Sequence, residues 1–120
     1  MIKSTLVTST DVDTPETVFT STTDGESAST QVSNAITTMI LCNTGSPNLT
    51  DESVNSVDCK VFLVTSGRTA ANTIVSNLTI PAGETVFFSD EKIILGAGDT
   101  IQVGTDTGSL LAVTVSFLQV

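Results

Sequence analysis

Short runs of apolar residues, separated by turn-forming residues, recur along most of this chain. The last run alternates most regularly, with Leu111, Val113, Val115 and Phe117 at one parity and small or polar residues between them. A period of two is typical of a β-strand that buries one face. No segment of useful length follows the 3.6-residue period of a helix. The pattern therefore predicts an all-β chain.

Turn signals divide the chain into strands. In the C-terminal half the sequences PAGE, GAGD and GTDTGS mark turns, and Pro81 ends the strand before it because proline has no N–H to donate. In the middle, the apolar runs at residues 36–43 and 57–66 flank a long turn-rich segment, and we expect them to form an antiparallel pair. About eight short strands with this spacing predict a single antiparallel β-sandwich or small barrel.

Residues 1–34 differ from the rest because they are polar and contain only two short apolar runs. We expect an N-terminal arm with edge strands here, within the same domain as a sandwich core at residues 35–120. We expect the order of this arm to depend on a neighbouring chain. Deletion of residues 1–24 should then leave a soluble core.

Composition narrows the function. The 120 residues fit one domain, and 4 basic against 13 acidic residues give a net charge of −9. Nucleic-acid binding is not expected, because the basic residues are scattered and the chain has neither Trp nor Tyr. No apolar segment is long enough for a membrane helix or a signal peptide, so we expect synthesis in a cytoplasm. Without histidine, Ser-His-Asp and Cys-His sites are excluded, and we expect neither enzyme activity nor a cofactor.

Four charged residues are candidates for contacts with a partner or an ion. Asp11, Asp13 and Glu16 stand close together, and spaced carboxylates on a loop can bind calcium. The spacing lacks the EF-hand pattern, so a solvated loop is favoured and no metal site is assigned. Arg68 stands at an expected loop tip, either paired with a neighbour's carboxylate or simply exposed.

The two cysteines, Cys42 and Cys59, match neither a zinc site nor a redox Cys-x-x-Cys pair. Two interpretations stay open. They are two buried thiols that pack as small apolar side chains, or they form a disulfide between neighbouring strands. The disulfide would form only if the protein leaves the reducing interior of the cell.

Residues 77–120 combine an Ala-Gly-Glu-Thr turn, a strand ending in Leu, a Gly-Asp-Thr-Ile turn and a closing Val-rich strand. This segment, preceded by residues 36–43 and by VFLV at residues 61–64, resembles a β-sandwich module of small structural proteins of tailed phages, especially marine and cyanobacterial ones. The resemblance implies a place in the virion and no catalytic residues. The long segment at residues 44–56 departs from the module and is either a contact loop or a tolerated insertion.

Three functions follow from these observations. The first is a capsid decoration or cement protein that bridges neighbouring subunits of the major capsid protein. We expect it to be a homo-oligomer, with a trimer favoured, because short strands leave the monomer marginally stable. The second is a tail, neck, baseplate or fibre component. The third is a receptor-binding or carbohydrate-binding sandwich, against which the absence of Trp and Tyr counts.

Overall fold

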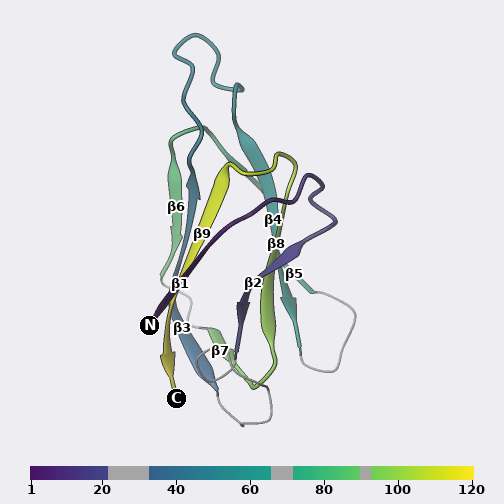
Figure 1. The fold of residues 1–120 in the computed structure, drawn as a ribbon, viewed down its shortest axis with the longest axis vertical. Helices are drawn as coiled ribbons and strands as arrows, with labels where there is room; N and C mark the ends of the chain where they lie inside the picture. Colours follow the sequence, from purple (N-terminus) through teal and green to yellow (C-terminus); the bar gives the residue numbers. More distant parts are fainter. Residues whose placement is uncertain (22–32, 66–71, 90–92) are drawn as a thin grey trace.

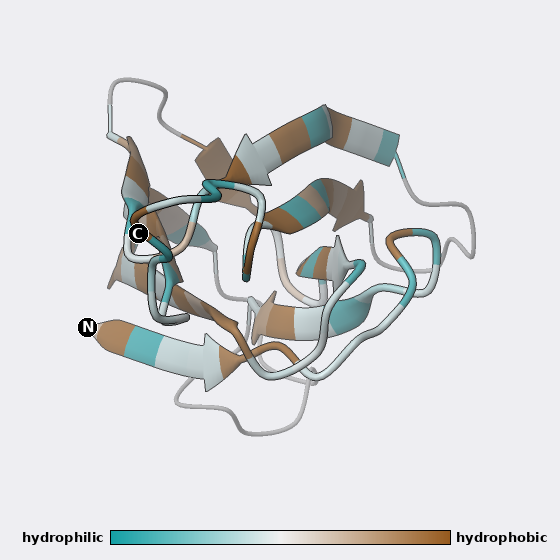
Figure 2. Cartoon of the chain, turned by 90° about the horizontal axis from the view of Figure 1, so that it is seen from above, coloured by the Kyte–Doolittle hydropathy of each residue, from teal (hydrophilic) through white to brown (hydrophobic). Residues whose placement is uncertain are grey.

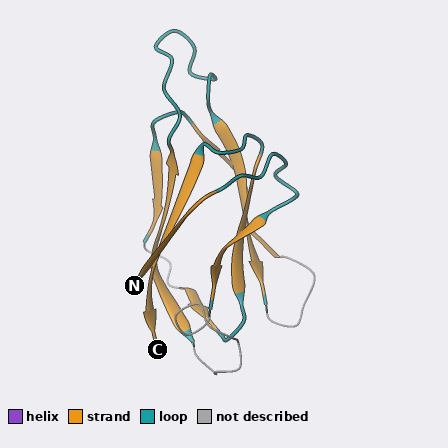
Figure 3. Cartoon of the chain, viewed as in Figure 1, coloured by secondary structure: helices purple, strands orange, loops and turns teal. Residues whose placement is uncertain are grey.

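The computed structural model describes residues 1–21, 33–65, 72–89 and 93–120. Within these ranges the chain forms nine strands and no helix (Figure 3). The strands make two antiparallel sheets packed face to face, in a molecule of 51 × 26 × 22 Å (Figure 1). The all-β class is therefore confirmed, and of the two predicted architectures the chain adopts the β-sandwich.

Each sheet mixes strands from both halves of the sequence. Sheet A, the five-stranded sheet, has the order β1-β9-β3-β6, and β7 also pairs with β3. Sheet B, the four-stranded sheet, has the order β2-β8-β4-β5. The bounds are β1 Ile2–Leu6, β2 Glu16–Thr20, β3 Asn34–Asn43, β4 Val57–Val64, β5 Asn72–Ile80, β6 Thr85–Phe88, β7 Ile93–Leu95, β8 Thr100–Thr105 and β9 Leu111–Gln119.

The expected pairing of the two central strands is wrong. Strand β3 pairs with β6, β7 and β9, whereas β4 pairs with β5 and β8 in the other sheet. The segment at residues 44–56 carries the chain from one sheet to the other, so the two strands face each other across the core. The two strands have similar apolar patterns because each buries one face. This alternation shows that a strand is half-buried, but it does not show which strand is its neighbour.

The N-terminal segment is built into both sheets. Strand β1 pairs with β9, and β2 pairs with β8. Val7, Val18 and Phe19 are buried, and the ring of Phe19 lies edge-on against that of Phe117 at 4.7 Å between centroids. Deletion of residues 1–24 would remove these three side chains from the core, so we expect the deletion to destabilise the remaining core, whose predicted solubility stays a prediction.

The interior is filled by the inward-facing positions of both sheets, including Leu41, Val61, Ile101 and Val113. Figure 2, which looks along the molecule, shows apolar and polar positions alternating along the strands. Two predicted turns are confirmed, at residues 81–84 and 96–99, where Glu84 N–H donates to Pro81 and Asp99 N–H to Gly96. Both are type II turns, because their third residues, Gly83 and Gly98, have φ of 80° and 85°.

Candidate functional site

The acidic loop before β2 is held by its own side chains. A carboxylate oxygen of Glu16 accepts a hydrogen bond from the Thr8 backbone N–H, and the other accepts one from the Thr8 hydroxyl at 3.1 Å. Asp11 Oδ1 accepts the Asp13 N–H at 2.9 Å, and Asp13 forms an ion pair with Lys60 Nζ at 2.8 Å. The three carboxylates thus have structural partners within the chain.

This loop lies on the outer face of sheet B. A Cβ added to Gly104 of β8 would meet the Val12 carbonyl oxygen at 2.2 Å, which shows how closely the loop approaches the strand. The Thr105 hydroxyl donates to the Ser9 carbonyl at 2.7 Å and fixes the loop further. Among the described residues, no group of three or more carboxylates and thiols is arranged to hold a metal ion.

The cysteines are free and lie in different sheets. Cys42 of β3 is half-buried on the outward side of sheet A, paired with Thr85 and Ala112. Cys59 of β4 is buried between the sheets. Burial, followed by the nearby carboxylates of Asp58 and Asp106, raises the pKa of Cys59 to about 11, which keeps it a thiol at neutral pH. Arg68, the remaining candidate, lies outside the described residues.

The long segment at residues 44–56 extends one end of the molecule (Figure 1). Asn48 Oδ1 accepts the Thr50 N–H at 2.9 Å, and Asp51 Oδ1 accepts the Ser53 hydroxyl at 2.6 Å, so the segment is internally hydrogen-bonded. The bonds from Ser53 hold the pKa of Asp51 below its usual value. Leu49, by contrast, is 99% exposed. The segment therefore presents an apolar side chain on an ordered scaffold.

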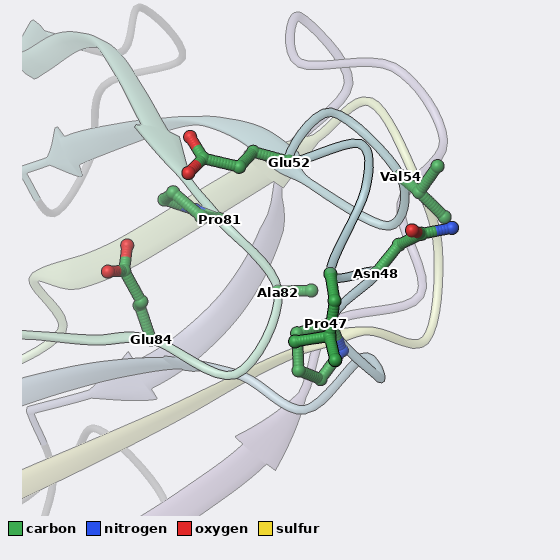
Figure 4. Close-up of a pocket in the computed structure, with 8 residues that line it drawn as sticks. Pro47, Asn48, Glu52, Val54, Pro81, Ala82 and Glu84 are labelled. Carbon is green, nitrogen blue, oxygen red and sulfur yellow. The ribbon is translucent and has the colours of Figure 1, made fainter.

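A shallow cleft of about 290 Å³ lies between this segment and the turn at residues 81–84. Figure 4 shows the carboxylates of Glu52 and Glu84 on the same side of the cleft, with Pro81 between them in this view. The other lining residues are Pro47, Asn48, Leu49, Val54 and Ala82. The lining combines apolar rings with carboxylates and contains neither a thiol nor a hydroxyl that could act as a nucleophile.

A second hollow, of about 310 Å³, opens between the two sheets on the side of β5, β6 and β7. Its lining is entirely apolar: Ile36, Met39, Ile74, Val75, Phe88, Ile93 and Ile101. None of these side chains could react with a ligand as an acid, a base or a nucleophile, or donate a hydrogen bond to it.

The outer face of sheet A is a surface on which several large apolar side chains are exposed. Strand register puts three rows of side chains across it. Ala35 lies between Ile94 and Leu118, Ile40 between Phe87 and Thr114, and Cys42 between Thr85 and Ala112. Ser4 of β1 continues the second row, and its hydroxyl lies 3.0 Å from that of Thr114.

None of the described side chains that point outward from these five strands carries a charge. Five of them are large apolar side chains that are 48% to 72% exposed: Ile2, Leu6, Phe87, Ile94 and Leu118. Sheet B differs, because its outward positions include Asp58 and Lys60 and its face carries the ion pair to Asp13. In a chain of net charge −9, a broad uncharged face is the clearest candidate for an interface.

The sequence contains a signal for this face that a search for alternating apolar and polar residues does not find. Met39-Ile40-Leu41, Val86-Phe87-Phe88 and Ile93-Ile94-Leu95 are three consecutive apolar residues each, so each strand must place an apolar side chain on both of its faces. Only the assembled sheet reveals that the three outward members lie on one surface.

Comparisons with models of known protein families, with curated proteins and with solved structures gave no match to this chain. The resemblance to phage structural proteins therefore stays a prediction. In the described part of the chain there is no helix of the length and apolarity that crossing a bilayer requires.

Proposed function

We propose that this chain is a structural protein of a phage-like virion, which decorates the capsid and bridges neighbouring subunits of the major capsid protein. The observation that carries the proposal is the uncharged outer face of sheet A, with its five exposed apolar side chains. A broad sheet face suits packing against protein better than enclosure of a small ligand, because small ligands are bound in concave sites.

The extended segment at residues 44–56 supports the same role. Leu49 projects fully exposed from a segment that Asn43 ties to the sandwich, through hydrogen bonds of 2.8 Å to the carbonyls of Asn55 and Ile80. Binding through an ordered segment loses little conformational entropy. We assign this end of the molecule to contact with the capsid, with Leu49 as the anchoring side chain.

Copy number in purified particles tests the function and separates it from the alternatives. A decoration protein should occur in hundreds of copies, measured as gel band intensity relative to the major capsid protein. Tens of copies or fewer would instead indicate a tail, neck, baseplate or fibre component. Absence of the chain from purified particles would refute a virion role altogether.

A matched pair of variants tests the assigned contact. Leu49→Ser should lower the occupancy of particles without changing the unfolding midpoint of the protein, because this side chain is 99% exposed. Thr50→Ser, at the next position, should leave occupancy unchanged and serves as the control. Unchanged occupancy in both variants would show that the capsid contact lies elsewhere.

A further inference from the structure

We infer that the outer face of sheet A is the interface between two copies of this chain, stacked face to face about a two-fold axis. The inference rests on the proposed function, because both treat this face as an interface. It adds the identity of the partner, which is a second copy of the chain. Both members of such a pair use the same patch, which is the property of an isologous two-fold contact. The pair would carry two segments 44–56, and a bridging protein needs two such contacts with the capsid.

The absence of charge on the described part of the face suits a second copy of the chain as the partner. A basic partner of this acidic protein would be recognised through carboxylates, yet no described outward side chain of sheet A is charged. A second copy brings an equally uncharged face. Stacking therefore buries no charge in the contact and leaves the carboxylates of both copies, such as those on the face of sheet B, in water.

Four hydroxyl groups on or beside β9 are already paired within the sheet. The Ser4 and Thr114 hydroxyls are 3.0 Å apart, and the Thr37 hydroxyl lies 3.1 Å from that of Ser116 and donates to the Ser116 carbonyl at 3.0 Å. Polar groups that have partners within the sheet lose less when water leaves the surface. The central part of the face can therefore become dry at a low desolvation cost.

The relief of the face suits self-stacking. The outward side chains of β9 are small along most of its length, at Ala112, Thr114 and Ser116, and they separate the larger side chains of β1 from those of β3 and β6. In a face-to-face pair, the large side chains of each copy can enter the space above the small side chains of the other. Such interdigitation is how the inner faces of stacked sheets pack at about 10 Å separation.

The size of the face is sufficient for a reversible pair. Four strands spaced by about 4.8 Å and a rise of about 3.4 Å per residue along β9 give a face of roughly 550 Å². Two copies would thus bury about 1,100 Å² in total, near the lower limit of specific interfaces. We expect a dimer that dissociates on dilution rather than a permanent one.

Sedimentation velocity of the intact chain over a range of concentrations tests the inference. Wild type should shift reversibly from monomer to dimer. Phe87→Lys and Phe87→Glu should each raise the dissociation constant at least about tenfold, because both place an unpaired charge within the contact, on edge strand β6. Comparing a positive with a negative substitution separates this effect from long-range electrostatics, because only the positive charge would be attracted to the acidic partner copy. Leu49→Lys, at a more exposed apolar site off the face, should still dimerise like wild type.

Alkylation of Cys42 provides a second measurement, since this residue lies on the same face. Its rate should fall as protein concentration rises in wild type, but not in the Phe87 variants. Circular dichroism and the unfolding midpoint of each variant would verify that it is folded.

Three results would overturn the inference: a wild-type monomer at all concentrations, a trimer, or a dimer that both Phe87 variants leave intact. These results are distinct from failure of the proposed function. A monomer found in hundreds of copies on particles would contradict the inference alone, whereas a dimer absent from particles would contradict the function alone.

Discussion

Asn43 is the residue on which the extended end of the molecule depends most. It is buried, and its side-chain amide donates to the carbonyls of Asn55 and Ile80 at 2.8 Å each while its Oδ1 accepts the Gly45 N–H at 2.9 Å. Asn43→Ala would leave the buried Ile80 carbonyl, the partly buried Asn55 carbonyl and the Gly45 N–H without these partners. We expect a loss of about 2–4 kcal/mol of unfolding free energy, measured by urea denaturation.

A neighbouring asparagine provides the control. Asn48 also binds backbone groups, but it lies on the exposed part of the segment, where water can replace its bonds. Asn48→Ala should therefore cost less than about 1 kcal/mol. Equal losses for the two variants would show that the buried amide has no special part in holding the segment.

Gly104 determines how the acidic loop and strand β8 fit together. An added Cβ would overlap the Val12 carbonyl oxygen, at 2.2 Å, and backbone cannot move aside as a flexible side chain can. Gly104→Ala should therefore displace the loop from sheet B and lower the unfolding free energy by about 1–3 kcal/mol. Thermal unfolding measures the loss, and amide exchange of residues 9–14 should accelerate.

Gly96→Ala is the matched control for this substitution. The nearest atom to an added Cβ there is Asp99 Oδ2 at 3.5 Å, an ordinary contact, and the φ of Gly96 lies outside the left-handed region. The change should shift the unfolding free energy by less than about 1 kcal/mol. If amide exchange in the acidic loop stayed unchanged in Gly104→Ala, the close approach of loop and strand would be refuted.

The strands could be predicted from the sequence, but their partners could not. Pro81, Gly83 and Gly98 mark turns through backbone requirements that act locally, so the ends of the strands beside them were found. Strand neighbours depend on which faces meet across the core, and β3 and β4 have similar patterns although they lie in different sheets. Strand β7 has only three residues and extends the edge of sheet A where β6 ends.

The candidate interface was hidden for the same reason. Each outward apolar residue, such as Ile40 or Ile94, is unremarkable in its own strand, and only the register brings them onto one face. The acidic loop presents the converse case. Its carboxylates stand out in the sequence, but they bind groups of the same chain, either nearby, as Glu16 binds Thr8, or distant, as Asp13 binds Lys60.

The net charge of −9 opposes the pairing of two copies, although the face on which they would meet is neutral. Repulsion between the remaining carboxylates acts over a screening length of about 30 Å at 10 mM salt and about 8 Å at 150 mM. Added salt should therefore strengthen the dimer, with a dissociation constant several-fold lower at 150 mM than at 10 mM sodium chloride, measured by sedimentation equilibrium. An interface held by ion pairs would respond in the opposite direction, because salt screens their attraction. Weaker association at higher salt would thus exclude the neutral face as the contact, even if the chain proved dimeric.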